Sequence, residues 1–207
     1  GDGMTYLYTN PSDYAFNFWP TVDAHRLPGV TTDRCITRPE CTGEYRSTTP
    51  WTGGVSLKGI YGTAGMDFKQ HNSKVTPMSD VSAKKSWFMF DDEVVSLGVG
   101  ITSTSGRTIE TVADNRLLNS QGSNPLTVNG TEKPSTLGWS EIMDNVNWIH
   151  LDGTGGYVFP GGTSLNGLRE KREGSYYDIN QKYYQRTNDE FNDTVQKSTW
   201  LWIREDK

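Results

Sequence analysis

The strongest hydrophobic pattern in the chain has a period of two and lies between residues 87 and 112. An unbroken apolar run at 87–90 is followed at 95–101 by Val, Leu, Val and Ile, which alternate with small residues. This alternation is typical of β-strands, whose successive side chains point to opposite faces of a sheet. Because the intervening residues are small, we expect another layer to pack closely against their face. Ser105-Gly106 then marks a turn before 108–112, which predicts a hairpin.

Shorter strand-like stretches follow the same logic along the rest of the chain, separated by turn signals. They lie at 4–8, 126–128, 148–151, 157–159 and 200–203, and only 138–146 has a faint helical spacing. Short strands at close intervals predict an all-β fold, a large antiparallel β-sandwich with no helix longer than about four turns. The chain begins just before one predicted strand and ends just after another. We therefore expect residues 1–207 to be an incomplete segment of a longer protein.

Composition agrees with short strands and tight turns. Hydrophobic residues make up 33% of the 207 positions and aromatic residues 12%, with 22 glycines. The formal net charge is -5 and no block of Lys and Arg stands alone, so nucleic acid is not an expected partner. No stretch approaches the roughly 20 apolar residues that a membrane span requires, so no membrane partner is expected. No signal peptide is visible in the residues that follow Gly1, and we expect either that a leader has been removed or that a longer stretch precedes Gly1.

Two cysteines, Cys35 and Cys41, lie within a long polar loop at 31–54. Two thiols do not complete a zinc site, and no histidine is near them in sequence. A disulfide and two free thiols remain equally open on redox grounds. A loop of this length in a compact domain is commonly functional, and we expect it to contribute to specificity.

Five stretches in order across nearly the whole chain resemble polysaccharide lyase family 8, the family of xanthan, hyaluronate and chondroitin AC lyases. They are Gly1–Tyr8, Phe18–Gly29, Lys84–Glu93, Glu110–Arg116 and Gly153–Gly174. The resemblance implies the central super-sandwich-like β region that follows a helical toroid. It implies β-elimination of a uronic-acid-containing polysaccharide, with an Asn, a His and a Tyr on the toroid as the catalytic residues.

None of those three catalytic residues has a match in this chain, so the resemblance implies that the isolated chain is inactive. We expect a piece of a secreted lyase whose partners are an acidic polysaccharide and the toroid of the same enzyme. Xanthan is favoured, with hyaluronan and chondroitin as possibilities. The alternatives are a non-catalytic carbohydrate-binding or scaffold domain and an unrelated adhesin, and the adhesin leaves the five stretches unexplained. No organic cofactor is expected.

The resemblance also indicates two residues that touch substrate. Asn17 matches a family asparagine that contacts sugar, whereas Tyr14 departs from members with a glutamate at that position. The alternative is that Phe16, Phe18 and Trp19 are core residues and that Asn17 caps a turn. Arg186, beside Tyr183 and Tyr184, resembles an arginine that binds a terminal acidic group in xanthan-type lyases, and its alternative is a plain surface loop.

Asp91, Asp92 and Glu93 form an acidic run at the end of a predicted strand. Adjacent carboxylates repel one another unless a cation lies between them, and oxygen ligands favour calcium. The resemblance to xanthan-type lyases favours a structural Ca²⁺ here, with a further ligand beyond Lys207. The alternative is a solvated turn. The three histidines, His25, His71 and His150, have no neighbours that suggest catalysis.

Overall fold

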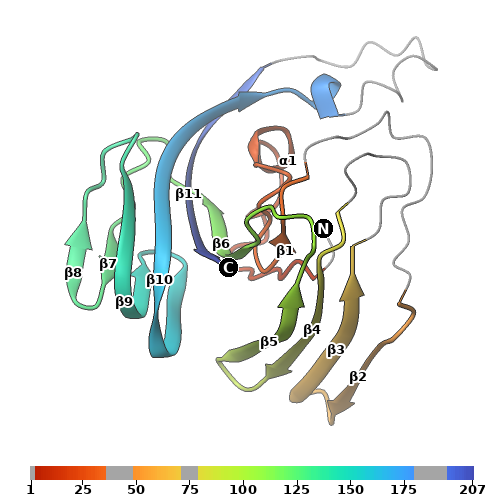
Figure 1. Cartoon of the computed structure of the whole chain (residues 1–207). Coiled ribbons are helices and arrows are strands. Elements are labelled where there is room, and N and C mark those ends of the chain that lie inside the picture. Colours follow the sequence, from red (N-terminus) through yellow and green to blue (C-terminus); the bar gives the residue numbers. More distant parts are fainter. Residues whose placement is uncertain (1–2, 36–48, 71–78, 180–194) are drawn as a thin grey trace. The chain divides into compact units, whose positions relative to one another are not determined.

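A computed structural model describes residues 3–35, 49–70, 79–179 and 195–207. The chain divides into two compact units: one holds residues 3–30 and 110–207, and the other holds residues 31–109 (Figure 1). The chain therefore starts in the first unit, builds the second and returns to complete the first. Strands dominate both units, and all strand pairs whose register is resolved among the described residues are antiparallel, as the sequence predicts.

The sheet of the first unit has strands in the order β6-β11-β10-β9-β7-β8. Their bounds are β6 (Glu110–Leu117), β7 (Leu126–Val128), β8 (Thr131–Lys133), β9 (Ser140–Leu151), β10 (Gly155–Gly174) and β11 (Gln196–Asp206). Figure 1 shows β10 as a long bent ribbon. Its pairing with β9 shifts register between Val158 and Leu165, where Gly161 and Gly162 adopt positive φ. A bulge at this position bends the strand.

β11 is the central element of this unit because its residues 198–203 are buried on both faces. On one face Leu201 and Ile203 join a core with residues of β7, β9 and β10, among them Leu126 and Leu165. On the other face Trp200, fully buried, joins a second core formed by the N-terminal segment. The apolar run that predicted a strand at 200–203 therefore corresponds to a strand covered on both sides.

The second unit is a four-stranded meander in the order β2-β3-β4-β5, preceded by the two-residue strand β1 (Thr31–Thr32). The four strands are β2 (Thr52–Leu57), β3 (Tyr61–Lys69), β4 (Ser82–Met89) and β5 (Val94–Thr102). Its core is small and consists of Phe68, Val81, Ala83 and Ile109, with partly buried neighbours. Among the described residues, this unit contributes fewer buried apolar side chains than the first.

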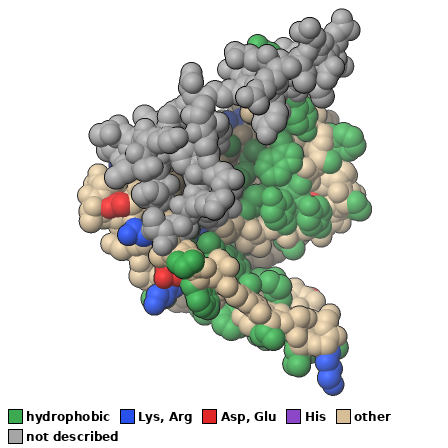
Figure 2. All heavy atoms as spheres, turned by 90° about the vertical axis from the view of Figure 1, so that its right-hand side faces the viewer, with side chains coloured by type: hydrophobic (Ala, Val, Ile, Leu, Met, Phe, Trp, Pro, Cys, Tyr) green, Lys and Arg blue, Asp and Glu red, His purple; other side chains and the backbone are tan. Residues whose placement is uncertain are grey.

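One face of this four-stranded sheet carries exposed apolar side chains from all four strands. The register places Val55, Thr63, Phe88 and Val95 opposite one another, so they share that face. The exposed apolar residues that alternate onto this face are Val55, Leu57, Tyr61, Phe88, Val95, Leu97 and Val99. Figure 2, which views the side where β2 and β3 lie in Figure 1, shows hydrophobic side chains at the surface. An apolar face of this extent marks a surface for contact with another molecule or domain.

Several predictions for individual elements were wrong. The helical spacing at 138–146 belongs to β9, because a bulge with Asn145 at positive φ places Met143 and Val146 on the same buried face three positions apart. Residues 4–8 form no strand, since the Leu7 backbone binds side chains. Ser96 and Gly98, the small residues of β5, are exposed. The second layer that we expected against their face is therefore not formed by the described residues.

The predicted hairpin around Ser105-Gly106 was also wrong. β5 pairs with β4 across a tight turn at 91–92, in which Phe90 N donates to Glu93 O over 2.9 Å. β6 instead pairs with β11. The connection at 103–107 is held by side-chain hydrogen bonds to Asp80 and Asp33 rather than by strand pairing. No helix in the described residues is long and apolar enough to cross a membrane.

Glu110 joins two arginines in a largely buried ion-pair group. It accepts hydrogen bonds from Arg26 Nε over 2.7 Å and from Arg26 Nη2 over 2.9 Å, and it also pairs with Arg204. Both guanidinium groups lie over the Trp202 ring, with the Arg26 group 4.5 Å from the ring centroid. This group connects the turn after α1 (Phe18–Thr21) to β6 and β11.

We predict that Glu110→Gln lowers the free energy of unfolding by about 3 kcal/mol, because Arg26 and Arg204 lose their shared, buried carboxylate. Arg26 keeps its pair with Asp23 at 3.6 Å, and Arg204 keeps its pair with Asp206 at 3.0 Å. The matched control is Glu173→Gln, which breaks an exposed pair with Lys197 at 3.0 Å and should cost less than about 1 kcal/mol. Urea unfolding of both variants measures the difference. Equal losses would show that Glu110 contributes no more than a surface ion pair.

Lys85 of β4 is 8% exposed, and its burial lowers the pKa of its ammonium group from 10.5 to about 8. Between these two pH values the unfolded chain binds a proton that the folded chain does not. The free energy of unfolding therefore rises with pH from about 8 to about 10.5, by roughly 3 kcal/mol in total, and this gain is lost as the pH falls through 8.

We predict that Lys85→Met removes this rise. Unfolding curves at pH 7.5 to 10.5 measure it, with Lys84→Met, an exposed lysine of the opposite face, as the control. A parallel rise in both variants would contradict the assignment.

Candidate functional site

The short helix α1 carries the substrate-contact residue predicted from sequence, and aromatic packing holds it in place. Phe18, 1% exposed, lies edge-on to Tyr14, Trp19 and Trp200, with ring centroids 4.8, 5.0 and 5.2 Å away. Such edge-to-face contacts add to the free energy gained by burying the rings. The start of this one-turn helix is thereby fixed to the central strand β11.

Polar contacts fix the other end of α1. Arg172 Nε of β10 donates to Thr21 O over 2.7 Å, and Trp200 Nε1 donates to Thr21 Oγ1 over 3.2 Å. A Cβ on Gly174 would overlap the Pro20 carbonyl group, so only glycine allows β10 to approach this closely. The helix therefore has little freedom to shift relative to β10 and β11.

Asn17 precedes the first residue of α1, and its side chain makes no capping hydrogen bond. Its backbone carbonyl accepts a hydrogen bond from Thr21 Oγ1 over 2.5 Å, which fixes the residue. No described residue binds its side-chain amide. The alternative interpretation, in which Asn17 caps a turn, is therefore not met, and a half-buried amide with free donors and acceptors lies on a rigid support.

Tyr14 faces the interior and takes no part in this surface. Its hydroxyl accepts hydrogen bonds from Leu7 N over 3.0 Å and from Arg116 Nη1 over 3.2 Å. Burial raises the pKa of Tyr14. Tyr14 is thus a neutral side chain that braces the N-terminal segment from the inside.

A buried group of charges lies beside Tyr14, and sequence reasoning missed it. Asp114 of β6 accepts from Arg116 Nε over 3.1 Å and from the Tyr157 hydroxyl, and Arg116 Nη2 donates to Leu7 O over 2.8 Å. Desolvation raises the pKa values of Asp114 and Tyr157. The bonds from Arg116 to Leu7 and Tyr14 connect the N-terminal segment to the sheet. Asp114 and Arg116 are nearly inaccessible to solvent. The sequence signal that could have indicated this group is the presence of Asp114 and Arg116 two positions apart in the stretch Glu110–Arg116.

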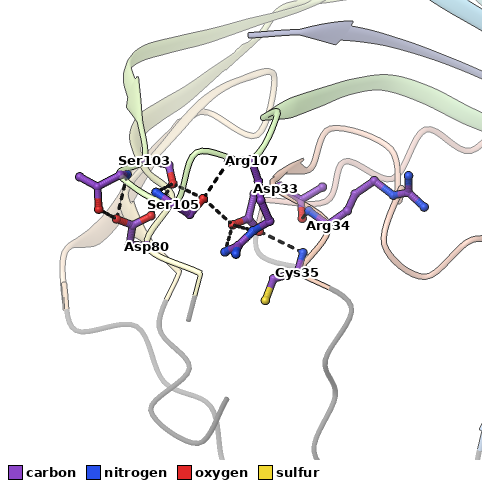
Figure 3. A network of polar contacts seen from close by, with 9 residues as sticks. Asp33, Arg34, Cys35, Asp80, Ser103, Ser105 and Arg107 are labelled. Atoms are coloured by element: carbon purple, nitrogen blue, oxygen red, sulfur yellow. Dashed lines mark hydrogen bonds and ion pairs between the residues drawn. The ribbon is translucent and has the colours of Figure 1, made fainter. Parts of the chain in front are cut away.

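Figure 3 shows a second polar network that sequence reasoning missed, in the unit of residues 31–109. The Asp33 side chain is fully buried and accepts from Arg107 Nε over 3.0 Å and Nη2 over 2.6 Å. Asp80 accepts from Thr104 N over 2.9 Å and from Ser103 Oγ. These bonds from Ser103 and Thr104 hold the pKa of the half-buried Asp80 well below its usual value. The network connects three separate segments of this unit and is structural in character.

The acidic run lies in the turn between β4 and β5, and all three side chains of Asp91, Asp92 and Glu93 are exposed. Among the described residues no group of three His, Cys, Asp or Glu side chains is placed to hold a metal ion. These residues therefore do not form a calcium site by themselves. Calcium binding stays a prediction that requires a further ligand.

Other predicted residues divide between described and undescribed parts of the chain. Arg186, Tyr183 and Tyr184 lie outside the described residues, so the binding of an acidic sugar group by Arg186 stays a prediction. Cys41 and His71 also lie outside them, so the pairing of Cys35 with Cys41 stays open. His150 is exposed on β9, and the His25 backbone N–H donates to Asp23 Oδ1 over 3.0 Å. No hydrogen bond among the described residues joins either histidine to Asn17.

Comparison with known proteins identifies the family. The model of the polysaccharide lyase family 8 super-sandwich domain matches residues 1–204. A xanthan lyase from Bacillus sp. (strain GL1) is 46% identical over 88% of this chain, and a hyaluronate lyase from Thermasporomyces composti is 38% identical over 87%. The matched regions make up 19% and 23% of those proteins, so the chain spans about a fifth of the relatives it matches.

Solved structures agree with the sequence comparison. A Paenibacillus xanthan lyase superposes on all of this chain with a TM-score of 0.85 and 45% identity, covering 19% of its own length. A Streptomyces coelicolor A3 chondroitin AC lyase superposes on 96% of the chain with a TM-score of 0.69 and 33% identity, covering 23% of its own length. The fold, the matched family model and the relatives agree, and the chain therefore belongs to polysaccharide lyase family 8 and forms its super-sandwich domain.

Proposed function

We propose that this domain is part of a secreted bacterial lyase that cleaves an acidic polysaccharide by β-elimination, and that it supplies one wall of the substrate cleft. Xanthan is the favoured polymer, because a xanthan lyase shows 46% identity, against 38% for a hyaluronate lyase. The observation that carries the proposal is the unbonded Asn17 amide on a helix fixed by β10 and β11. Such an amide pairs with sugar hydroxyl or carboxylate groups.

The catalytic residues are proposed to lie outside this chain. β-Elimination next to a uronate carboxylate requires a base within hydrogen-bond reach of the abstracted proton and donors that neutralise the carboxylate. Around Asn17, the described contacts include backbone groups, Thr21 and buried aromatic rings, and no described histidine or carboxylate is bound to it. The site is suited to hold a sugar rather than to move a proton.

The apolar face of β2–β5 supports a domain that belongs to a larger enzyme. Its exposed Val, Leu, Tyr and Phe side chains form the kind of surface that packs against another domain. We assign the helical toroid of the same lyase as the partner that completes the cleft. Calcium is proposed as a structural ion at Asp91, Asp92 and Glu93, where the three carboxylates require a ligand from elsewhere in the enzyme.

We predict that the 207-residue chain binds oligosaccharides prepared from xanthan at Asn17 without cleaving them. Asn17→Ala should weaken binding about tenfold, because the hydrogen bonds between the amide and a sugar hydroxyl or carboxylate group are lost. Amide chemical shifts in a titration report binding, and ultraviolet absorbance of the unsaturated product reports cleavage. The control is Asn119→Ala, which removes an asparagine whose side chain accepts from the backbone N–H groups of Gln121 and Ser123 in its own turn. Strong absorbance from the pure chain would overturn the placement of the catalytic residues, and undiminished binding by Asn17→Ala would contradict the cleft assignment.

We predict that calcium raises the melting temperature of the intact lyase and that Asp92→Ala removes this increase, since an ion bound only to the native state stabilises it. The isolated chain should show a weak effect, because its three acids lie exposed in a turn. Thermal melts in calcium and in chelator measure both. Identical melting of the intact enzyme in the two conditions would leave the acidic run as a solvated turn.

A further inference from the structure

Phe16, the residue before Asn17, presents its ring to solvent. It is 76% exposed, whereas Tyr14 and Phe18 on either side are 7% and 1% exposed. The inward rings at 14 and 18 belong to the aromatic core that holds α1, and Phe16 shares none of that packing. A phenylalanine exposed to this degree contributes little to folding by burial, so core packing does not explain a bulky aromatic side chain at this position.

The backbone of Phe16 is strained. Its φ is +50°, in the left-handed region that glycine adopts readily and that a bulky residue adopts only at a cost in stability. Four other described residues besides glycine have positive φ: Asn129 and Asn145, of a type that tolerates this region, and the long-chain Arg34 and Lys58. Phe16 is the aromatic residue in this group. Strain at a position where another residue would be more stable is characteristic of functional sites.

Two contacts determine the strained conformation. Phe18 N donates to Ala15 O over 3.1 Å and closes the turn around Phe16. The hydroxyl of Tyr176, far along the chain, donates to Phe16 O over 2.8 Å. With Phe18 buried against Trp200, these bonds fix where the Phe16 ring leaves the surface relative to the Asn17 amide.

An exposed ring next to an unbonded amide fits the chemistry of a sugar. A pyranose presents an apolar C–H face, which stacks on an aromatic ring, and hydroxyl groups at its edge, which pair with an amide. We propose that Phe16 is a glycan-contact residue whose ring stacks on a sugar of the acidic polysaccharide beside the sugar bound by Asn17. This inference rests on the proposed function and adds a second contact residue to it.

The test uses the chain of residues 1–207, labelled with ¹⁵N and titrated with oligosaccharides prepared from xanthan, hyaluronan and chondroitin. Phe16→Ala should weaken binding at least about fivefold, and Phe16→Trp, which keeps an aromatic ring, should stay within about twofold of the unaltered chain. Phe16→Gly should melt at a higher temperature than Phe16→Ala, because glycine relieves the strain, while binding as weakly. The matched control, Phe90→Ala, removes another exposed phenylalanine in the other unit and should leave binding unchanged.

The outcomes separate this inference from the function on which it rests. If Asn17→Ala weakens binding but Phe16→Ala and Phe16→Gly bind like the unaltered chain, the role of Phe16 is refuted and the cleft wall stands. If no oligosaccharide shifts the Asn17 amide in the unaltered chain, the cleft wall itself is refuted and the role of Phe16 falls with it. Equal binding losses for Phe16→Trp and Phe16→Ala would also overturn stacking, because the ring is then not what the ligand recognises.

Discussion

The burial of β11 on both faces is the constraint on which the rest of the first unit depends. Strand pairing fixes β11 between β6 and β10, and alternation then sends Leu201 and Ile203 into one core and Trp200 into the other. The second core requires a cover, which the N-terminal segment supplies through Phe18 and its neighbours. Because protein interiors pack densely, α1 has one position in which this core is filled. The placement of Asn17 follows from that position.

Buried charges define the path of the N-terminal segment over the sheet. Arg116 binds the Leu7 carbonyl and the Tyr14 hydroxyl while pairing with Asp114, and Arg26 pairs with Glu110. Hydrophobic contact alone tolerates small slips, whereas a buried ion that loses its partner is costly. These pairs therefore select one register for a segment that forms no strand. In functional terms they support the surface on which a polysaccharide is proposed to lie.

The two units differ in how they use apolar residues. The first buries them in two cores, and its proposed glycan contacts stand out as exceptions: an amide with no hydrogen-bond partner in the described part of the chain and an exposed ring on strained backbone. The second has a small core and an apolar sheet face that is exposed in this chain. A rigid unit with a few unsatisfied groups is suited to recognition, and a sheet with an open apolar face is suited to packing within a larger enzyme. Membership in a family whose matched relatives are about five times longer agrees with this division.

The sequence by itself determined the all-β class, the family, most strands and Asn17 as a candidate, because period two and local motifs depend on neighbouring residues. It did not determine which strands pair, since that choice depends on the far side of each strand: β6 pairs with β11 rather than β5, and a bulge gave β9 a helical spacing. Nor did it reveal the ion pairs of Glu110 and Asp114, whose partners are distant in sequence. The exposure of Phe16 was equally hidden, because a ring in an aromatic stretch is expected inside. Only the tertiary structure decides that the rings at 14 and 18 fill the core and the ring between them remains outside.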